Sequence, residues 1–210
     1  MPQISLPCRH LDASVRIGLW KIAETEEALY SQYPELYHYK AEVGEMKSSS
    51  RRMEFLVVRA LLKEMLGHVP LLQHNVDGKP LLPDGIGISI SHTRGYVAVI
   101  LSDTENVAVD IEYYSDRVCR VADKFIRKDE NAHDLRDKIL CWCSKETLYK
   151  LHSSDKLGFH EMRVDFSSLL VSGPGNGNFN IENLRRKTVL KMCFITTETY
   201  IMTYAHEKRV

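Results

Sequence analysis

The sequence predicts an α+β fold made of two similar halves, each with one long helix packed on a small, mostly antiparallel sheet. Three observations lead to this prediction. Each half contains one strong helical pattern, both halves contain strand pairs with hairpin spacing, and a short polar connector at 102–106 lies near the midpoint. We therefore expect two domains, residues 1–104 and 105–210.

The long helix of the first half is expected to begin near Ser48 and to end at Leu66. Serine at this position can cap the first turn, and Gly67 directly follows the last apolar residue. The expected core-facing stripe consists of Phe55, Val58, Leu62, Met65 and Leu66.

Two strands are expected to follow this helix. Asp77-Gly78 is a turn signal, and the segment 86–91 then alternates isoleucine with glycine or serine, which predicts a strand. A turn at 93–95 leads into a second apolar strand over 96–101. Because only a short turn separates the two, we expect them to pair as a hairpin.

The second half opens with an apolar strand over 107–112, and a long helix is expected over 134–151. A strand is expected over 162–166, and the density of glycine, proline and asparagine predicts a loop over 172–178. Two apolar segments then predict a closing hairpin, formed by 189–195 and 199–205.

The strand and the helix of the second half carry four charged side chains of particular interest. Because side chains alternate along a strand, Asp110 and Glu112 are expected on the same face. Glu146 and Lys150 are one helical turn apart and share a side of the helix. Three carboxylates beside a lysine would form a hard-cation site next to a phosphate-binding ammonium, which points to divalent-metal phosphoryl chemistry. The simpler alternative for Glu146 is an exposed glutamate on a helix that is apolar on several sides.

Composition excludes several other classes of function. Lys plus Arg and Asp plus Glu both number 28, so a nucleic-acid-binding protein that relies on overall charge is not expected. No apolar run approaches the length of a membrane span, and no secretory signal is visible, so we expect a cytoplasmic protein. The five cysteines have no spacing typical of disulfide frameworks or zinc sites, and we expect buried, reduced thiols.

At these residues the chain resembles the 4'-phosphopantetheinyl transferase superfamily, and in particular its monomeric, two-half, surfactin-synthetase-activating type. The family has a strand of type Val-Gly-Val-Asp-x-Glu and a helix of type Trp-x-x-Lys-Glu-x-x-x-Lys. Upstream it has a Gly-Lys-Pro turn and a strand ending Ile-Ser-x-Ser-His. The matching segments here are Val107–Glu112, with Ala108 where glycine is commoner, then Trp142–Lys150, Gly78–Pro80 and Ile88–His92.

The resemblance implies a Mg²⁺-dependent enzyme that moves the 4'-phosphopantetheine arm of coenzyme A onto a serine of an apo carrier protein. Adenosine 3',5'-bisphosphate would be the second product. The carrier would be an acyl, peptidyl or aryl carrier of fatty acid, polyketide or nonribosomal peptide synthesis. A phosphopantetheinyl transferase fold, a monomer, and no nucleic-acid or membrane partner are implied as well.

The resemblance also implies roles for individual residues. Asp110, Glu112 and Glu146 would hold Mg²⁺ against the pyrophosphate, and Lys150 would contact the pyrophosphate. Glu146 or a metal-bound water would accept the serine proton. The residues implied in binding the nucleotide part of coenzyme A are Arg51, Arg52, Lys79, Ser91 and His92.

Two other functions remain open at this stage. A non-catalytic module that binds coenzyme A or a carrier protein would tolerate damaged acids, yet Asp110, Glu112, Glu146 and Lys150 are all present. A metal-dependent phosphodiesterase or phosphatase usually shows clusters of histidine and aspartate for two metals, and the nine histidines form no such motif.

Overall fold

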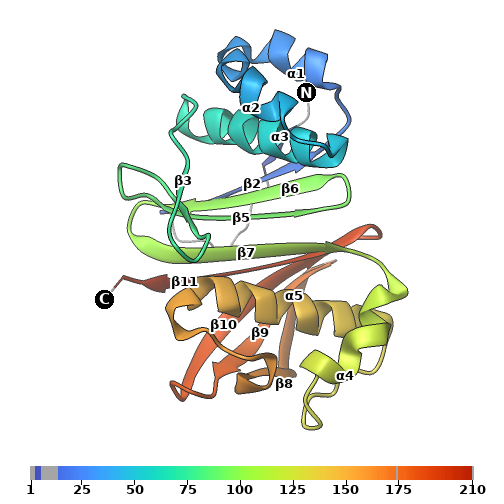
Figure 1. The fold of residues 1–210 in the computed structure, drawn as a ribbon. Coiled ribbons are helices and arrows are strands. Elements are labelled where there is room, and N and C mark those ends of the chain that lie inside the picture. Colours follow the sequence, from blue (N-terminus) through green and yellow to red (C-terminus); the bar gives the residue numbers. More distant parts are fainter. Residues whose placement is uncertain (1–2, 6–13, 174, 210) are drawn as a thin grey trace. The chain divides into compact units, whose positions relative to one another are not determined.

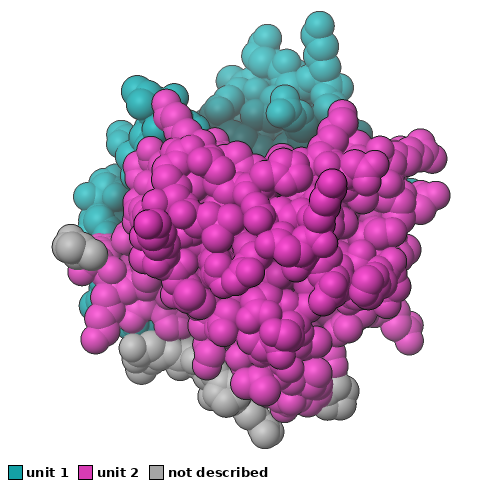
Figure 2. Space-filling view, turned by 90° about the horizontal axis from the view of Figure 1, so that it is seen from below, with its two compact units in different colours: residues 1–104 teal, residues 105–210 magenta. Residues whose placement is uncertain are grey.

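The computed structural model describes residues 3–5, 14–173 and 175–209. The chain divides into two compact units, unit 1 (Met1–Thr104) and unit 2 (Glu105–Val210), which Figure 2 shows in different colours. Each unit combines helices with an antiparallel sheet, which confirms the predicted α+β class.

The sheet of unit 1 has four antiparallel strands in the order β1-β2-β6-β5 (Figure 1). The predicted hairpin is confirmed, since β5 and β6 pair with each other. A separate two-stranded ladder joins β3 to β4. The strands are β1 (Gln3–Ser5), β2 (Val15–Lys21), β3 (Gln73–His74), β4 (Pro80–Leu81), β5 (Gly87–Thr93) and β6 (Tyr96–Ser102).

The helices of unit 1 are α1 (Glu26–Gln32), the 3₁₀ helix η1 (Pro34–Tyr39), α2 (Lys40–Gly44) and α3 (Ser49–Leu66). The boundaries of α3 confirm the sequence prediction. The Ser48 hydroxyl accepts from the Arg51 N–H at 3.4 Å, and Gly67 ends the helix in the left-handed conformation at φ 82°. Buried side chains of α3, such as Leu56 and Leu61, join Trp20 and Val99 of the sheet in one hydrophobic core.

The sheet of unit 2 has five antiparallel strands in the order β7-β11-β10-β9-β8 (Figure 1). The last strand of the chain, β11, therefore lies between β7 and β10, and the predicted closing hairpin of β10 and β11 is confirmed. The strands are β7 (Glu105–Tyr113), β8 (Met162–Gly173), β9 (Asn176–Asn183), β10 (Thr188–Thr196) and β11 (Tyr200–Lys208).

One long helix, α5 (Leu135–Leu151), contacts β7, β11, β8 and β9 (Figure 1). The predicted range is confirmed, and the Asp134 carboxylate caps the helix by accepting from the Asp137 N–H at 2.8 Å. The shorter elements are η2 (Asp116–Val121), α4 (Ala122–Phe125), η3 (Ser153–Asp155) and η4 (Phe159–Glu161).

The loop predicted over 172–178 was wrong for most of its length. The strand β8 continues to Gly173 and β9 already begins at Asn176, while Pro174 lies outside the described residues. Gly177 lies inside β9, and a Cβ atom there would come within 2.5 Å of the Phe194 ring. Glycine at this position therefore serves close strand packing, not a turn.

Within the described residues, no helix is long and apolar enough to cross a membrane. Of the five cysteines, Cys8 lies outside the described residues, and the other four are free thiols. Cys141 and Cys143 are buried as expected, whereas Cys119 is exposed and Cys193 is half-buried.

Candidate active site

The strand β7 presents Asp110 and Glu112 to the helix α5, as the alternation of side chains predicted. Lys150 Nζ donates to Asp110 Oδ1 at 2.6 Å, and Trp142 Nε1 donates to Glu112 Oε1 at 3.1 Å. Both donors belong to α5 and lie about two helical turns apart. The two secondary-structure elements therefore bring the predicted acids and the predicted lysine together.

Lys150 also binds the strand backbone, since its Nζ donates to the Val109 carbonyl oxygen at 3.2 Å. Its side chain keeps 28% of its surface exposed, whereas that of Asp110 is 7% exposed. A half-exposed ammonium beside a buried carboxylate can still reach an anionic ligand, because it retains hydrogen-bonding capacity toward solvent.

Electrostatic interactions couple Glu146 to both acids of the strand. Burial, together with the charges of Asp110 and Glu146, raises the pKa of Glu112 to about 7, against the opposing effects of Trp142 and Lys150. Burial also raises the pKa of Glu146, again with Asp110 adding to the effect and Lys150 opposing it. The three carboxylates therefore repel one another, and the single lysine only partly offsets that repulsion.

The chemistry of this cluster fits a divalent cation. Carboxylate oxygens are the ligands that Mg²⁺ prefers, and a cation would relieve the repulsion that raises the pKa values. Among the described residues, no three His, Cys, Asp or Glu side chains stand in an arrangement that could already hold a metal ion. One oxygen of each strand carboxylate accepts a hydrogen bond from α5, Asp110 Oδ1 from Lys150 and Glu112 Oε1 from Trp142.

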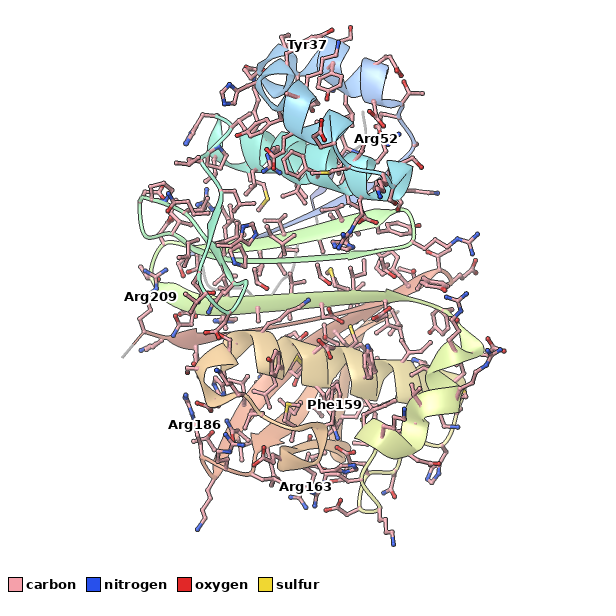
Figure 3. The ribbon with its side chains drawn as sticks, viewed as in Figure 1. Tyr37, Arg52, Phe159, Arg163, Arg186 and Arg209 are labelled. Carbon is pink, nitrogen blue, oxygen red and sulfur yellow. The ribbon has the colours of Figure 1, made fainter. Side chains whose placement is uncertain are left out.

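A second ion pair of α5 lies next to Glu146 in sequence but is fully buried. Lys145 Nζ donates to Glu130 Oε2 at 2.8 Å, and both side chains have no exposed surface. Backbone carbonyls of Phe125 and Phe159 accept further bonds from Lys145 at 2.6 and 3.2 Å. Figure 3 labels Phe159, which follows α5 in the chain; its ring centre lies 5.0 Å from that of Trp142, with the two ring planes tilted by 34°.

A pocket of about 340 Å³ opens beside Glu112 in unit 2. Apolar side chains of η2 and α5 form much of its wall, and Glu112 is its acidic group, with Arg117 nearby. A molecule bound here would therefore place an uncharged part against apolar walls and another part next to the acid cluster. Its lining residues are Glu112, Tyr113, Ser115, Arg117, Val118, Val121, Ile139 and Trp142.

Unit 1 contains a larger pocket of about 850 Å³, which lies between α3, β5 and the β3–β4 ladder. Two of the predicted nucleotide-binding residues, Arg51 and His92, line it. Lys47 and His74 add further basic groups, while Glu45 and Glu54 are the acidic groups of the lining. His92 Nδ1 lies 3.4 Å from a carboxylate oxygen of Glu54.

The other three predicted residues have different positions. Arg52 projects from α3 (Figure 3), but it forms an ion pair with Glu26 at 2.6 Å and lines a separate pocket. Ser91 alternates with the pocket-lining Ile90 and His92, so its side chain points to the opposite face of β5. Lys79 belongs to the turn whose neighbouring residues Gly78 and Pro80 line the pocket, and its backbone N–H donates to Asn75.

Sequence reasoning missed two charged residues that the structure makes prominent. Glu130 lies in the charged segment 127–130, which is typical of solvated surface. The signal that could have found it is Lys145, a lysine on a largely apolar helix that needs a buried anionic partner. Arg59 is the second, because it lies between Val58 and Ala60 on the buried face of α3.

Comparison with protein-family models assigns part of unit 1. The sequence model of the 4'-phosphopantetheinyl transferase N-terminal domain matches residues 41–102, the segment that contains α3, β5 and β6. No curated protein matches the chain. The match covers the Gly78–Pro80 turn and the Ile88–His92 strand end, while Asp110, Glu112, Glu146 and Lys150 lie beyond it. It supports a transferase of the 4'-phosphopantetheinyl transferase superfamily.

Proposed function

We propose that this chain is a Mg²⁺-dependent 4'-phosphopantetheinyl transferase of the two-half, surfactin-synthetase-activating type. It would transfer the phosphopantetheine arm of coenzyme A to a serine of an apo acyl, peptidyl or aryl carrier protein. The observation that carries the proposal is the cluster of Asp110, Glu112 and Glu146 beside Lys150, in which mutual repulsion and burial raise the pKa of Glu112 to about 7.

The reaction requires attack of a serine hydroxyl on the β-phosphorus of the coenzyme A pyrophosphate. Asp110, Glu112 and Glu146 would hold the Mg²⁺, which when bound would offset charge on the phosphate oxygens. Lys150 would exchange part of its contact with Asp110 for a pyrophosphate oxygen, since its ammonium is still partly exposed. Glu146 is our candidate for the group that accepts the serine proton, because it lies one helical turn from Lys150 and beside Asp110.

Unit 1 would contribute the binding of the nucleotide part of coenzyme A. The pocket lined by Arg51 and His92 offers basic groups for the 3'-phosphate and apolar walls for the adenine. Ser91 and Lys79 would support this pocket from neighbouring positions in β5 and in the turn. Arg52 has the weakest claim of the proposed residues, because its guanidinium is already paired with Glu26.

The alternative is a non-catalytic module that binds coenzyme A or a carrier protein. It is favoured by one observation, the absence among the described residues of a carboxylate group already arranged for a metal ion. Under this alternative the pocket of unit 1 would bind its ligand without any transfer.

The test is incubation of the protein with coenzyme A, Mg²⁺ and a panel of apo carrier proteins, followed by intact mass spectrometry of the carriers. We expect one carrier to gain the mass of one phosphopantetheine. Glu146→Gln should abolish this gain, whereas Glu198→Gln, at an exposed position in a turn, should leave it intact. Binding of coenzyme A without any gain of mass on any carrier would favour the non-catalytic module instead.

A further inference from the structure

A buried group of three polar side chains lies next to Asp110 in unit 2. It consists of Cys143 and Thr147, one helical turn apart on α5, and Thr203 of β11. All three residues are fully buried. Thr203 and Asp110 are partners on the adjacent strands β11 and β7, so their side chains lie side by side on one face of the sheet.

The hydrogen bonds of this group leave the thiol with two acceptors. The Oγ1 atoms of Thr147 and Thr203 lie 2.6 Å apart, and the Thr203 hydroxyl donates to Cys143 Sγ at 3.3 Å. The thiol in turn donates to the Ile201 carbonyl oxygen at 3.7 Å. Burial first, then the charge of Asp110 and a hydrogen bond to its carboxylate, raise the pKa of the thiol. Cys143 is therefore neutral, and its one proton is shared between a carbonyl and a carboxylate.

The residue type at position 143 directs this proton toward the sheet. Hydroxyl groups inside a helix tend to donate to the carbonyl oxygen four residues earlier. Ser144 does so to Leu140 at 2.6 Å, and Thr147 does so to Cys143 at 3.0 Å. A thiol is a weaker donor than a hydroxyl, and that of Cys143 is directed to β11 and β7 instead.

The other buried thiol of α5 provides a comparison. Cys141 Sγ donates to Glu130 Oε2 at 3.8 Å, and the side chain of Glu130 is fully buried in its ion pair. The acceptor of Cys143 is Asp110, a member of the carboxylate cluster. Two thiols that are two residues apart thus differ in whether their acceptor belongs to the proposed cation site.

We propose that Cys143 is a positioning residue, whose S–H group orients the Asp110 carboxylate in the metal-free protein and turns to the Ile201 carbonyl oxygen when Asp110 binds a cation. The inference rests on the proposed function, in which Asp110 is a ligand of Mg²⁺. A carboxylate bound to a cation is a weaker hydrogen-bond acceptor than a free one. The carbonyl oxygen keeps the buried proton bonded, and the Thr203 hydroxyl holds the sulfur in place.

The test follows the S–H stretching band of Cys143 by infrared spectroscopy. In the full chain with Cys8→Ser, Cys119→Ser and Cys193→Ser, only the two buried thiols remain, and Cys141→Ser then assigns both bands. A carbonyl oxygen is a weaker acceptor than a carboxylate, and a weaker hydrogen bond raises the stretching frequency. Mg²⁺ with S-methyl coenzyme A, which has no thiol, should therefore raise the frequency of the Cys143 band and leave that of Cys141 unchanged.

Calorimetry with the same ligands separates the outcomes. If Mg²⁺ and S-methyl coenzyme A bind but the Cys143 band does not move, this inference is overturned and the proposed function stands. Equal shifts of both bands would show a general change in α5 and overturn it too. A wild-type protein that binds neither coenzyme A nor its S-methyl form overturns both proposals.

The affinity for Mg²⁺ gives a second readout. Cys143→Ala should lower it by about tenfold in the presence of S-methyl coenzyme A, as for other residues that orient metal ligands. Cys143→Ser should not restore it, because the new hydroxyl would bond to the Ile139 carbonyl oxygen. Cys141→Ala is the matched control and should leave the affinity unchanged. Wild-type affinity in Cys143→Ala overturns the inference, and if that variant does not fold, the infrared measurement decides.

Discussion

Lys145 and Glu146 are consecutive residues of α5, yet the structure places them in opposite electrostatic situations. Lys145 is fully buried and donates three hydrogen bonds, with Glu130 as its counter-ion. Glu146 is half-buried, and burial together with the charge of Asp110 raises its pKa. A satisfied buried charge is typical of a structural role, whereas a repelled, accessible one is typical of a binding or catalytic role.

The same contrast applies to two other carboxylates, Glu130 beside Lys145 and Glu112 beside Glu146. Glu130 accepts from Lys145, and it also accepts from the backbone N–H groups of Arg127 and Val164, both at 2.7 Å. It thus ties together the segment after α4, the helix α5 and the start of β8. Glu112 accepts one hydrogen bond described above, from the indole N–H of Trp142, and its raised pKa shows that its anionic form is disfavoured. One helix therefore carries a fixed ion pair and, one residue further on, a member of the carboxylate cluster that we propose as a cation site.

The largest expected effect is a loss of protein stability when the buried ammonium of Lys145 is removed. Lys145→Met should lower the free energy of unfolding by about 3–5 kcal/mol, because Glu130 is left as an uncompensated buried charge. Urea denaturation followed by circular dichroism measures this loss. Lys128→Met, at an exposed position two residues before Glu130 in the chain, should change stability by no more than about 0.5 kcal/mol. Similar curves for the two variants would contradict the structural role of Lys145.

The second effect is stabilisation of the acid cluster by a cation. At pH 7.5, Mg²⁺ with coenzyme A should raise the free energy of unfolding by about 2–3 kcal/mol when the ligands are near a hundredfold above their dissociation constants. Thermal unfolding with and without EDTA measures the contribution of the metal. Glu112→Gln should lose most of the stabilisation that depends on Mg²⁺ and keep the stabilisation that coenzyme A gives without the metal. Identical unfolding of the wild-type protein with and without Mg²⁺, under all these conditions, would argue against the metal site.

The fold could be predicted from the sequence where local signals decide it. The caps at Ser48, Gly67 and Asp134 mark the ends of the two long helices, and they depend only on residues nearby in the chain. The shared face of Asp110 and Glu112 follows from strand alternation alone. The helix ends and the shared face of these two acids can therefore be predicted from the sequence alone.

What could not be predicted depends on contacts between distant segments. The Gly- and Asn-rich segment after Ser172 has the composition of a loop, but pairing of β8 with β9 and the close approach of Phe194 to Gly177 make it a hairpin. The Glu130–Lys145 pair joins two segments whose separation no local pattern specifies. The orientation of Ser91 away from the pocket depends on which face of β5 meets α3, and both faces contain small or apolar residues.

The third effect is a pH dependence of stability in the absence of metal. The pKa of Glu112 is about 7 in the folded protein, against an ordinary value of 4.5, so the folded state holds a proton that the unfolded state releases. Stability from this group is fully present below pH 4.5 and is lost as pH rises to about 7. At about 1.4 kcal/mol per pKa unit, with allowance for solvent screening, the loss is about 1–3 kcal/mol.

Glu112→Gln isolates this contribution, because the amide oxygen can still accept from Trp142 while carrying no charge. The variant should be more stable than wild type at pH 7.5 and nearly equal to it at pH 4.5, in urea denaturation without Mg²⁺. Groups with lowered pKa values, such as Asp155 and Asp165, titrate below this range and cancel in the difference. A difference between variant and wild type that does not vary with pH would show that Glu112 titrates normally.

The smallest expected effect concerns the indole of Trp142, which donates a hydrogen bond to Glu112. Trp142→Phe keeps a ring against Phe125 and Phe159, whose ring centres both lie at 5.0 Å, but it removes the donor to Glu112 Oε1. The bond lowers the pKa of Glu112, so its loss should move the pKa still higher and extend the decline of stability above pH 7. The direct cost in stability should be about 1 kcal/mol.

Trp20→Phe is the matched control, since Trp20 Nε1 also donates to a glutamate, Glu24, at 3.2 Å, but in unit 1. It should cost a similar amount without altering the pH dependence. Urea denaturation between pH 4.5 and 9 compares the two variants. A shift of the pH dependence in Trp142→Phe but not in Trp20→Phe would show that the indole tunes the acid cluster, because loss of ring packing alone would affect both proteins equally at every pH. Identical pH dependence in the two variants would assign Trp142 to packing only.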